Sequence, residues 1–244
     1  MEAIKRIRSL QQKKYRDREG AFLVQGRKAV EELLRSSFEV LSVHVRKGSS
    51  LPAEALAPPW YERTEEDMAR IGTLSTGNEI VAVARIPGPH KVSAIGASEL
   101  ILAFDGVSDP GNMGTLLRIA DWFGVEQVLC STDCVDVYNP KCVQASMGSL
   151  FRVAVEVGDL PERSKDLREK GCALYLADMA GIPVQRAELT RPAVLVMGSE
   201  SHGLSSGVRG SGGALIAVPR VGRAESLNVA MAASALCMEF HRQA

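Results

Sequence analysis

Five polar side chains lie in or just after three loops that follow strand-like segments, and their chemistry would suit a polar or anionic ligand. The first loop, DGVSDPGNMG, leads into a helix that carries Asn112 and, six residues further on, Arg118. Arg118 has apolar neighbours, and a guanidinium in such company needs a partner because burying its donors unpaired is costly. A salt bridge or a side chain extended to solvent would meet this need. A phosphate or carboxylate held by two hydrogen bonds would meet it equally well.

The other two loops carry the remaining polar candidates. The loop VMGSESHGLS holds Glu200 among small residues, which let backbone groups approach a ligand closely. The loop VPRVGRAESLNV holds Ser226 and Asn228. We expect Ser226 to cap the helix that follows and Asn112 to cap the helix of the first loop, because their side-chain oxygens can accept from unpaired N–H groups. A role as helix cap explains why Ser226 stands at its position, but it explains Asn228 poorly.

Strand-like and helical segments alternate around these loops. The strands read LILAF, EQVLC, FRVAVEV, ALYLAD, AVLVMG and ALIAVP, and we expect helices at 112–123, 139–148, 160–170 and 227–242. This alternation predicts an α/β fold in which a mostly parallel sheet carries helices on both faces. Ligands bind beyond the carboxyl ends of such strands, so the three loops are predicted to meet at one edge.

A second, smaller α/β unit precedes this region. Strand-like segments AFLVQG, VLSVHVRKG and EIVAVARIPG alternate with segments of helical pattern, the first of them covering residues 3–16. A short helix followed by a Gly-containing turn is expected at 65–77. Regular structure should stop at RIPGPHKVSAIGAS, because of its Pro and Gly residues. We therefore predict a domain at 1–90, a linker at 91–98 and a second domain at 99–244.

The composition indicates a folded globular protein, with 45% hydrophobic and 24% charged residues. No apolar run approaches the roughly 18 to 20 residues that span a bilayer, and the N-terminus lacks the apolar core of a secretion signal. We therefore expect a cytoplasmic protein with no membrane partner. The five cysteines lack the paired spacing of a zinc site, so we expect buried thiols and no metal. A metal held by Cys130 and Cys134 is the alternative.

The charge is unevenly distributed although the net charge is zero. Residues 1–91 hold 16 Lys and Arg against 12 Asp and Glu, whereas residues 92–244 hold 13 against 17. Much of the excess lies near the start, at Lys5, Arg6, Arg8, Lys13, Lys14, Arg16 and Arg18. Such a basic cluster is typical of a surface that contacts phosphates, although a solvated helix face without a partner has the same pattern.

Nucleotide-binding motifs of the usual kinds are missing from the sequence. Neither G-x-G-x-x-G nor G-x-x-x-x-G-K-[ST] occurs. A nucleotide-like cofactor would therefore have to be held in another way.

Three ordered segments resemble a known family. DPGNMGTLLRIADWFGV, VMGSESHGLS and VPRVGRAESLNVAMAASALCMEF look like the three motifs of the SpoU (TrmH-like) RNA ribose methyltransferases of the SPOUT class. A further block, VDVYNPKCVQASMGSLFRVAV, resembles the segment between the first and second motifs. Residues 1–90, with REGAFLVQGRKAVEELL, are similar to the ribosomal-protein-like RNA-binding domain often attached to these enzymes, although more loosely.

The resemblance implies methyl transfer from S-adenosyl-L-methionine to a ribose 2′-hydroxyl of structured RNA. It also implies a C-terminal trefoil knot and a homodimer. By motif position, Gly198, Val218 and Leu227 would line the cofactor pocket. The family's polar active-site positions match Asn112, Arg118, Glu200, Ser226 and Asn228.

The general base of this reaction is left open by the resemblance. The family's motif arginine has been proposed for that role, but a guanidinium is effectively always protonated. We therefore expect Arg118 to hold a substrate phosphate and to stabilise the negative charge that develops on the hydroxyl oxygen.

Ribosomal RNA is the expected substrate, with tRNA as the alternative. Two other functions are possible for a chain with these motifs. One is methylation of a base, which the SLN and NMGTLLR signatures disfavour. The other is a non-catalytic RNA-binding factor of ribosome assembly, which the joint presence of the polar residues disfavours.

Overall fold

Residues 2–73, 79–91, 96 and 99–243 are described by the computed structural model of the chain. Internal contacts divide the chain into two compact units. The first comprises Met1–Gly88 and Asp136–Arg152, and the second comprises Pro89–Val135 and Val153–Ala244. The predicted turn at 74–77 and most of the predicted linker 91–98 lie outside the described residues.

A four-stranded sheet forms the centre of the first unit. Its order is β1-β4-β2-β3, with β1 (Ala21–Gln25), β4 (Ile80–Arg85), β2 (Val40–Arg46) and β3 (Trp60–Arg63). The β1–β4 and β4–β2 pairs are antiparallel and the β2–β3 pair is parallel. Alternate strand residues pack against the helices α1 (Glu2–Ser9) and α4 (Glu65–Ile71), in a core that includes Ile4, Ile7, Leu23, Met68, Ile71, Val81 and Val83.

The predicted helix over residues 3–16 is two helices, α1 and α2 (Lys13–Glu19), separated by a turn. The carbonyl oxygens of Leu10 and Gln11 in this turn accept hydrogen bonds from the guanidinium of Arg16, at 2.9 and 3.0 Å. The Gln11 side chain donates to the carbonyl oxygens of Ile71 and Gly72. A side chain thus takes the place of helical N–H groups at two carbonyl oxygens, and the turn is bonded to residues about sixty positions away. Local periodicity could not show either contact.

The remaining helical elements of the first unit are α3 (Arg27–Leu34) and the 3-10 turn η1 (Ala53–Leu56), together with a later part of the chain. That part, residues 136–152, contains α6 (Pro140–Ser146) and the 3-10 turn η2 (Ser149–Phe151). The Tyr138 ring packs on Phe22 with centroids 4.8 Å apart, and Phe151 packs on Phe38 at 5.4 Å. These residues lie within the predicted second domain in sequence but pack in the first unit.

His44 on β2 is a buried histidine that is held neutral. Its Nδ1 accepts from Nε of Arg63 at 3.1 Å, so Nε2 carries the hydrogen and donates to Oγ of Ser42 at 3.0 Å. Burial, and secondarily the charge of Arg63, lowers the pKa of His44 from 6.5 to about 4. The folded protein therefore resists protonation of this ring in a pH range where the unfolded chain accepts it.

We expect the free energy of unfolding to fall as the pH drops from 6.5 to about 4. The unfolded chain binds a proton below pH 6.5 and the folded chain does so only below about 4, so His44 contributes no slope above 6.5. The expected loss is ~1.4 kcal/mol per pH unit within that window. Urea unfolding at pH 7.5 and pH 5 measures it. The variant His44→Gln, which can keep both hydrogen bonds, should show a shallower slope; an unchanged slope would refute the assignment.

The second unit is built on a six-stranded sheet in which every pair of neighbouring strands is parallel. The order is β10-β8-β9-β5-β6-β7. The strands are β5 (Leu100–Asp105), β6 (Gln127–Ser131), β7 (Ala154–Gly158), β8 (Ala173–Pro183), β9 (Ala193–Gly198) and β10 (Ala214–Ala217). The predicted parallel sheet is therefore confirmed.

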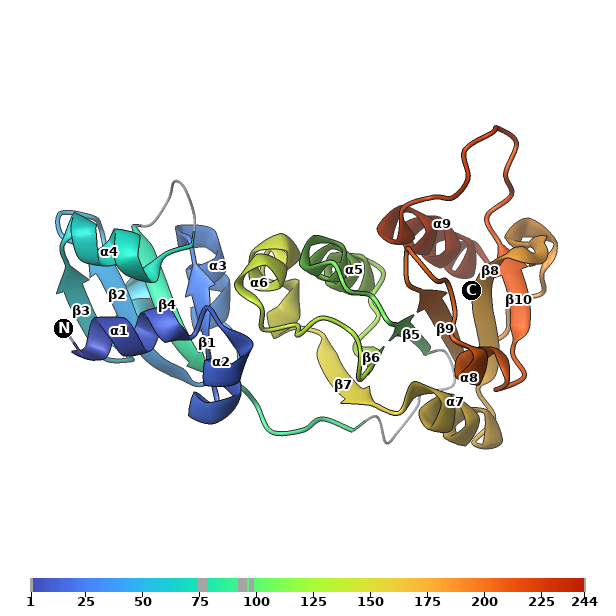
Figure 1. Cartoon of the computed structure of the whole chain (residues 1–244), viewed down its shortest axis with the longest axis horizontal. Helices are drawn as coiled ribbons and strands as arrows, with labels where there is room; N and C mark the ends of the chain where they lie inside the picture. Colours follow the sequence, from blue (N-terminus) through green and yellow to red (C-terminus); the bar gives the residue numbers. More distant parts are fainter. Residues whose placement is uncertain (1, 74–78, 92–95, 97–98, 244) are drawn as a thin grey trace. The chain divides into compact units, whose positions relative to one another are not determined.

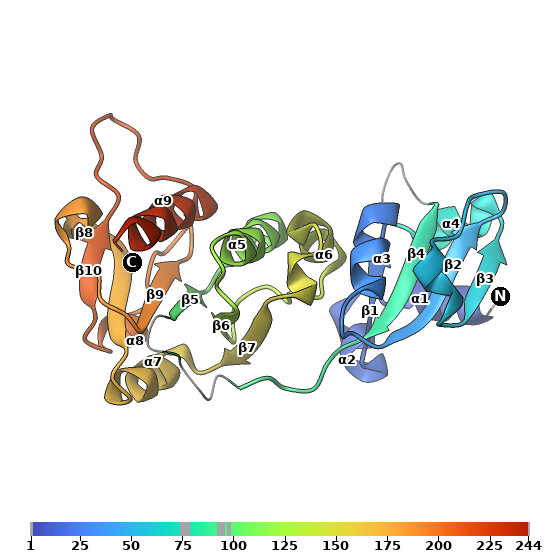
Figure 2. The same ribbon diagram turned by 180° about the vertical axis from the view of Figure 1, so that it is seen from behind.

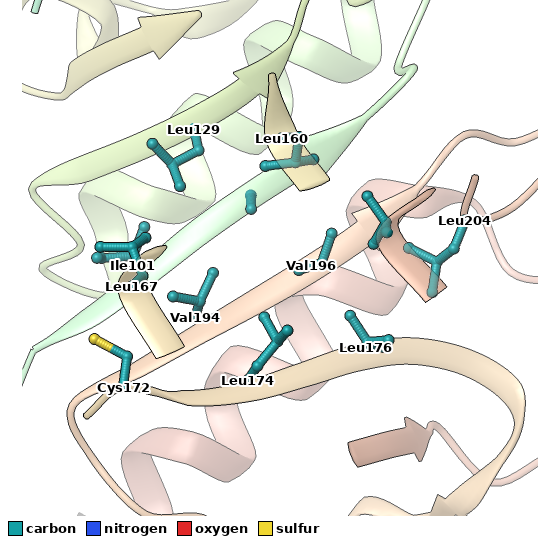
Figure 3. Close-up of a cluster of buried hydrophobic side chains, with 12 residues drawn as sticks. Ile101, Leu129, Leu160, Leu167, Cys172, Leu174, Leu176, Val194, Val196 and Leu204 are labelled. Carbon is teal, nitrogen blue, oxygen red and sulfur yellow. The ribbon is translucent and has the colours of Figure 1, made fainter. Parts of the chain in front are cut away.

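Helices cover both faces of this sheet (Figures 1 and 2). The helices α5 (Pro110–Trp122) and α9 (Val229–Arg242) pack together on one face, and α7 (Leu160–Glu169) and α8 (Ser206–Arg209) lie on the other. Between the sheet and α7 a buried cluster forms, in which Ile101, Leu129 and Val196 meet Leu160 and Leu167 (Figure 3). This core fixes the strand ends from which the candidate loops start.

Within the described residues no helix is long and apolar enough to cross a membrane. The same residues contain no group of three or more His, Cys, Asp or Glu side chains that could hold a metal ion. All five cysteines are thiols, and four of them are buried.

Candidate functional site

The three candidate loops leave the carboxyl ends of β5, β9 and β10. The strands β5 and β9 are neighbours, with Asp105 and Gly198 as register partners at their last positions. The strand β10 lies at one edge of the sheet beside β8. The loop from β10 to α9 extends away from the sheet (Figures 1 and 2), and most of its residues are exposed.

The first helix of the site begins earlier than predicted. Asp109, and not Asn112, caps α5: its Oδ1 accepts from the backbone N–H of Asn112 at 2.8 Å, and Pro110 occupies the first helical turn. Asp is as good a cap as Asn, and a proline directly after it is favoured. The prediction that Asn112 is the cap is therefore wrong. The Asn112 side chain is left available for other contacts.

Asn112, Glu200 and Asn228 are joined by side-chain hydrogen bonds. Nδ2 of Asn112 donates to Oε1 of Glu200 at 2.5 Å, and Nδ2 of Asn228 donates to Oδ1 of Asn112 at 3.0 Å. Three predicted site residues, one from each loop, are thereby brought together. These contacts also fix which atom of the Asn112 amide is the donor.

Asn228 is the cap of α9, which corrects the prediction that Ser226 caps it. Its Oδ1 accepts from the backbone N–H groups of Ala230 and Met231, at 2.9 and 3.3 Å. Ser226 lies two residues before the cap, exposed in the loop. Asn228, to which the sequence pattern gave no clear role, thus has two: its amide caps α9 and also orients the Asn112 side chain.

Arg118 is exposed, and it has no hydrogen-bond or ion-pair partner among the residues that the structure describes. The salt bridge that the sequence left open as an alternative is therefore not found in that part of the chain. Arg118 follows Asn112 by six residues on α5, or about 9 Å along a helix. Its guanidinium is free to bind a ligand that reaches α5.

A cavity of about 730 Å³ lies between the ends of β8, β9 and β10 and the start of α9. The lining includes Gly198, Val218 and Leu227, which are the three predicted cofactor residues, and also Glu200 and Ser226. Asn112, Arg118 and Asn228 are not part of the lining. A volume of several hundred Å³ is usual for a pocket that holds a small ligand.

Gly198 lines the cavity where the second loop lies close against the end of β9, and only a residue without a side chain fits there. A Cβ at this position would lie 2.3 Å from the carbonyl carbon of Gly203 and 2.5 Å from the backbone nitrogen of Leu204. Ser199 and Gly203 exchange two backbone hydrogen bonds, at 3.0 and 2.9 Å, which folds the loop back over the strand end. The buried carboxylate of Asp105 accepts from the N–H of Ser205 at 2.6 Å and secures the loop's far end.

Two acidic residues of the cavity wall were not singled out from the sequence, Asp178 and Glu225. Asp178 pairs with Arg209 of α8 and accepts from the N–H of Ala180 at 2.8 Å. It lies where the β8–β10 register shifts, so that the segment after Leu176 bows out toward the cavity. The position of Asp178 at the end of the strand-like segment ALYLAD could have indicated a site residue. That segment was not one of the three whose following loops were considered for the site.

The lining fits a cofactor such as S-adenosylmethionine. It combines apolar side chains, such as Met197, Ile216 and Leu236, with backbone groups and carboxylates. A mostly apolar wall with a few polar groups is typical of sites for ligands of this size. The carboxylates of Asp178, Glu200 and Glu225 would suit an amino group or ribose hydroxyls.

A model of the SpoU rRNA methylase family matches residues 99–238, which is more than half of the chain. The chain belongs to this family. The family resemblance seen in the three motifs is therefore confirmed. A model of the MRM3-like substrate-binding domain matches residues 2–82 of this SpoU methylase.

Relatives and solved structures span nearly the whole SpoU methylase chain. The 23S rRNA (guanosine(2553)-2′-O)-methyltransferase RlmP of Bacillus subtilis is 30% identical over 96% of this chain and 93% of its own. The AviRb methyltransferase of Streptomyces viridochromogenes, in complex with S-adenosylmethionine, is 27% identical with a TM-score of 0.89, covering 99% of this chain and 97% of its own. An S-adenosylmethionine-bound rRNA methyltransferase of Sinorhizobium meliloti has the same identity and TM-score, covering 98% and 94%.

Proposed function

We propose that this SpoU methylase transfers a methyl group from S-adenosylmethionine to a ribose 2′-hydroxyl of ribosomal RNA. The observation that carries the proposal is the hydrogen-bonded set of Asn112, Glu200 and Asn228, which stands beside a cavity suited to the cofactor. The matched family is one of rRNA methylases, and its RlmP relative is named for 2′-O-methylation of 23S rRNA. The cofactor is present in two of the solved relatives.

Gly198, Val218 and Leu227 hold the cofactor in this proposal, largely through backbone groups. Gly198 keeps the backbone of the second loop within reach because it has no side chain. When bound, S-adenosylmethionine supplies a methyl group that is already activated by the adjacent sulfonium. The protein must then align the ribose hydroxyl, and alignment alone contributes ~7 to 11 kcal/mol in well-oriented systems.

Arg118 holds the substrate rather than the cofactor in this proposal. Its exposed guanidinium can bind a phosphate of the RNA with two hydrogen bonds and stabilise negative charge on the reacting oxygen. The proton leaves through that phosphate or a water, because the guanidinium of Arg118 stays protonated and has no free lone pair with which to accept it.

Glu200 and Ser226, which both line the cavity, face the reacting groups from the cofactor side. Asn112 donates to Glu200, which fixes the direction of that carboxylate, and Asn228 fixes Asn112 in turn. The hydroxyl of Ser226 has no hydrogen-bond partner within the described chain and can bind a ribose oxygen. In this proposal these contacts orient the ribose hydroxyl.

The first unit binds the RNA in this proposal, but with fewer basic residues than the sequence predicts. Arg16 is buried and paired with Asp136, and Lys13 pairs with Asp17. Arg6 and Arg18 both pair with Glu19. Within the described residues, the exposed cations of this cluster without an acidic partner are Lys5, Arg8 and Lys14. These three cations are the ones that RNA could contact without competing with a carboxylate of the same unit.

The proposal keeps the predicted domains, with RNA binding by residues 1–90, a linker at 91–98 and methyl transfer by residues 99–244. It also keeps a trefoil knot. The strand β10 pairs with β8, whereas α9 packs on α5 and β9, so the chain passes over β8 between them, which supports this part of the proposal. The proposal also includes a cytoplasmic location, because its substrate, ribosomal RNA, is found there.

A homodimer is part of the same proposal, formed through the outer faces of α5 and α9. Trp122 of α5 is 84% exposed, and Met231 and Met238 of α9 are 65% and 60% exposed. Large apolar side chains gathered on two packed helices typically mark an interface.

The variant Trp122→Lys is expected to convert the dimer to a monomer, because a buried lysine at an apolar interface is unfavourable. Sedimentation equilibrium measures the change. Val157→Lys is the matched control, because Val157 is 59% exposed but lies on β7 and on neither of the two helices of the proposed interface. A wild-type monomer, or a dimer that survives both substitutions, would contradict this interface.

Methyl transfer in vitro tests the proposed function. The full-length protein is incubated with methyl-labelled S-adenosylmethionine and either ribosomal RNA or tRNA, and the RNA is digested to nucleosides. A labelled 2′-O-methylnucleoside from ribosomal RNA is the expected product. A methylated base would refute ribose transfer, and label in tRNA alone would refute the substrate. RNA binding without transfer would favour the non-catalytic assembly factor.

A further inference from the structure

Cys130 and Cys134 are a pair of thiols to which the proposed function gives no role, and both belong to the second unit. Cys130 lies on β6 with 1% of its surface exposed. Cys134 lies in the turn that follows, where its backbone N–H donates to the carbonyl oxygen of Ser131 at 3.1 Å. This turn brings the Cys134 sulfur into hydrogen-bonding contact with the Cys130 thiol. Cys134 is only partly buried, so a small molecule from the solvent can reach it.

The surroundings of Cys134 favour its thiolate. Its pKa is lowered from 9.0 to about 7. The hydrogen bond with Cys130 contributes most, and Ser131 and the nearby backbone add to it against the opposing effect of burial. Burial instead raises the pKa of the Cys237 thiol to about 12. Because the thiolate is the form that attacks an oxidant, Cys134 should react at neutral pH much faster than a thiol such as Cys237.

The turn that contains Cys134 also holds the chain that leads toward α5. Sγ of Cys134 donates to the carbonyl oxygen of Phe104 at 3.2 Å. Oγ of Ser131 accepts from the N–H of Gly106 at 2.8 Å. Residues 131–134 therefore hold the end of β5 and the first residue of the loop that follows it. All these contacts lie within the second unit.

We propose that Cys130 and Cys134 are an oxidation site, at which a peroxide converts the two thiols to a disulfide that slows methyl transfer. A reactive, accessible thiolate beside a second cysteine is the arrangement that such a site requires. This inference rests on the proposed function, because slower methyl transfer is one of its two readouts. The other readout is the disulfide itself.

The reaction proceeds in two steps with hydrogen peroxide as the oxidant. The Cys134 thiolate attacks one peroxide oxygen, the O–O bond breaks, and the departing hydroxide takes up a proton to leave as water. Cys134 is then a sulfenic acid. Cys130 attacks the Cys134 sulfur, the S–S bond forms, and the sulfenic oxygen leaves as a second water with the Cys130 proton. The two thiols together lose two hydrogens, and the peroxide is reduced to two waters.

The disulfide would alter the contacts that Cys134 makes with β5. The two sulfurs must approach to about 2.0 Å, which is well inside any hydrogen-bonded separation. Cys130 is fixed in β6 between β5 and β7, so Cys134 is the residue that shifts. Its sulfur also loses the hydrogen that it donates to Phe104. The end of β5 is thereby disturbed just before the loop to α5, the helix that carries Asn112 and Arg118.

The test treats the full-length protein with hydrogen peroxide, alkylates the remaining free thiols and digests the protein with trypsin. Both cysteines fall in one tryptic peptide, residues 119–141, which contains no other cysteine. We expect this peptide to lose two hydrogens and to escape alkylation. The kcat with ribosomal RNA should fall by about tenfold or more, because a small displacement far from the reacting atoms can lower a rate this much. Dithiothreitol should reverse both changes.

Two variants identify the responsible thiol, and each is compared with itself before and after treatment. Cys134→Ala removes the reactive thiol, so its kcat should not change on treatment with peroxide. Cys172→Ala is the matched control, because it removes a buried thiol of the same unit and leaves the pair intact. Its kcat should fall as far as that of the wild type.

Three results would overturn the proposal. The first is a treated peptide 119–141 in which the two cysteines are not linked. The second is a disulfide that forms without any change in kcat, and the third is an equal loss of kcat in Cys134→Ala. An untreated wild-type protein without methyl transfer would instead refute the proposed function, and the peptide masses would still decide whether the disulfide forms.

Discussion

Replacement of Arg118 by alanine is expected to lower kcat for RNA methylation by about 100- to 1,000-fold, as loss of one charge-stabilising group does in other enzymes. The dissociation constant of S-adenosylmethionine should stay within about twofold of its wild-type value. The reason is geometric, because Arg118 is exposed on α5 and takes no part in the cavity lining. Single-turnover kinetics and calorimetry measure the two quantities separately.

Two companion variants sharpen this expectation. Arg118→Lys should also fail, because a point charge cannot form the planar pair of hydrogen bonds that a phosphate accepts from a guanidinium. Arg186→Ala removes another exposed arginine of the second unit, outside the cavity lining, and should leave kcat unchanged. Near-normal turnover of the lysine variant would show that charge alone suffices. Equal losses of turnover and cofactor affinity would refute the division of tasks.

The variant Gly198→Ala is expected to weaken S-adenosylmethionine binding by about tenfold or more. The added Cβ would lie 2.3 Å from the backbone of Gly203, so the second loop must move away from the strand end. Forcing a methyl group into a packed site typically costs ~1 to 3 kcal/mol, and 1.4 kcal/mol is a factor of ten in affinity. Calorimetric titration with the cofactor measures the effect.

Gly158→Ala is the matched control for this change. Gly158 ends β7 as Gly198 ends β9, but a Cβ there would meet no heavy atom within 4 Å. Its cofactor affinity and Tm should match the wild type. An alanine at 198 that binds the cofactor normally would show that the second loop does not form the cofactor site.

The parallel sheet could be predicted because each strand is a short apolar run and the intervening helices have caps and polar faces. The meeting of the three loops followed from the same alternation. The caps themselves were harder to predict: Asn112 and Ser226 are good cap residues, yet Asp109 and Asn228 hold those positions. Several candidates for one cap stand within a few residues, and only the path of the backbone decides among them.

Contacts between distant parts of the chain could not be predicted from local patterns. The hydrogen bond between Asn112 and Glu200 joins residues 88 positions apart, and that between Arg16 and Asp136 joins residues 120 apart. The second of these pairs buries Arg16 and so removes it from the basic surface, while the same guanidinium bonds the carbonyl oxygens of the turn that interrupts the predicted N-terminal helix. Both effects depend on burial, which hydrophobic periodicity in the first twenty residues does not show.

Mapping ribose 2′-O-methylation across all RNA from cells with and without the gene is the most direct measurement. The proposed function predicts the loss of methylation at one or a few ribosomal RNA nucleotides, restored by the wild-type chain but not by Arg118→Ala. Identical maps in the two kinds of cell, or sites lost only from tRNA, would contradict methylation of ribosomal RNA by this protein.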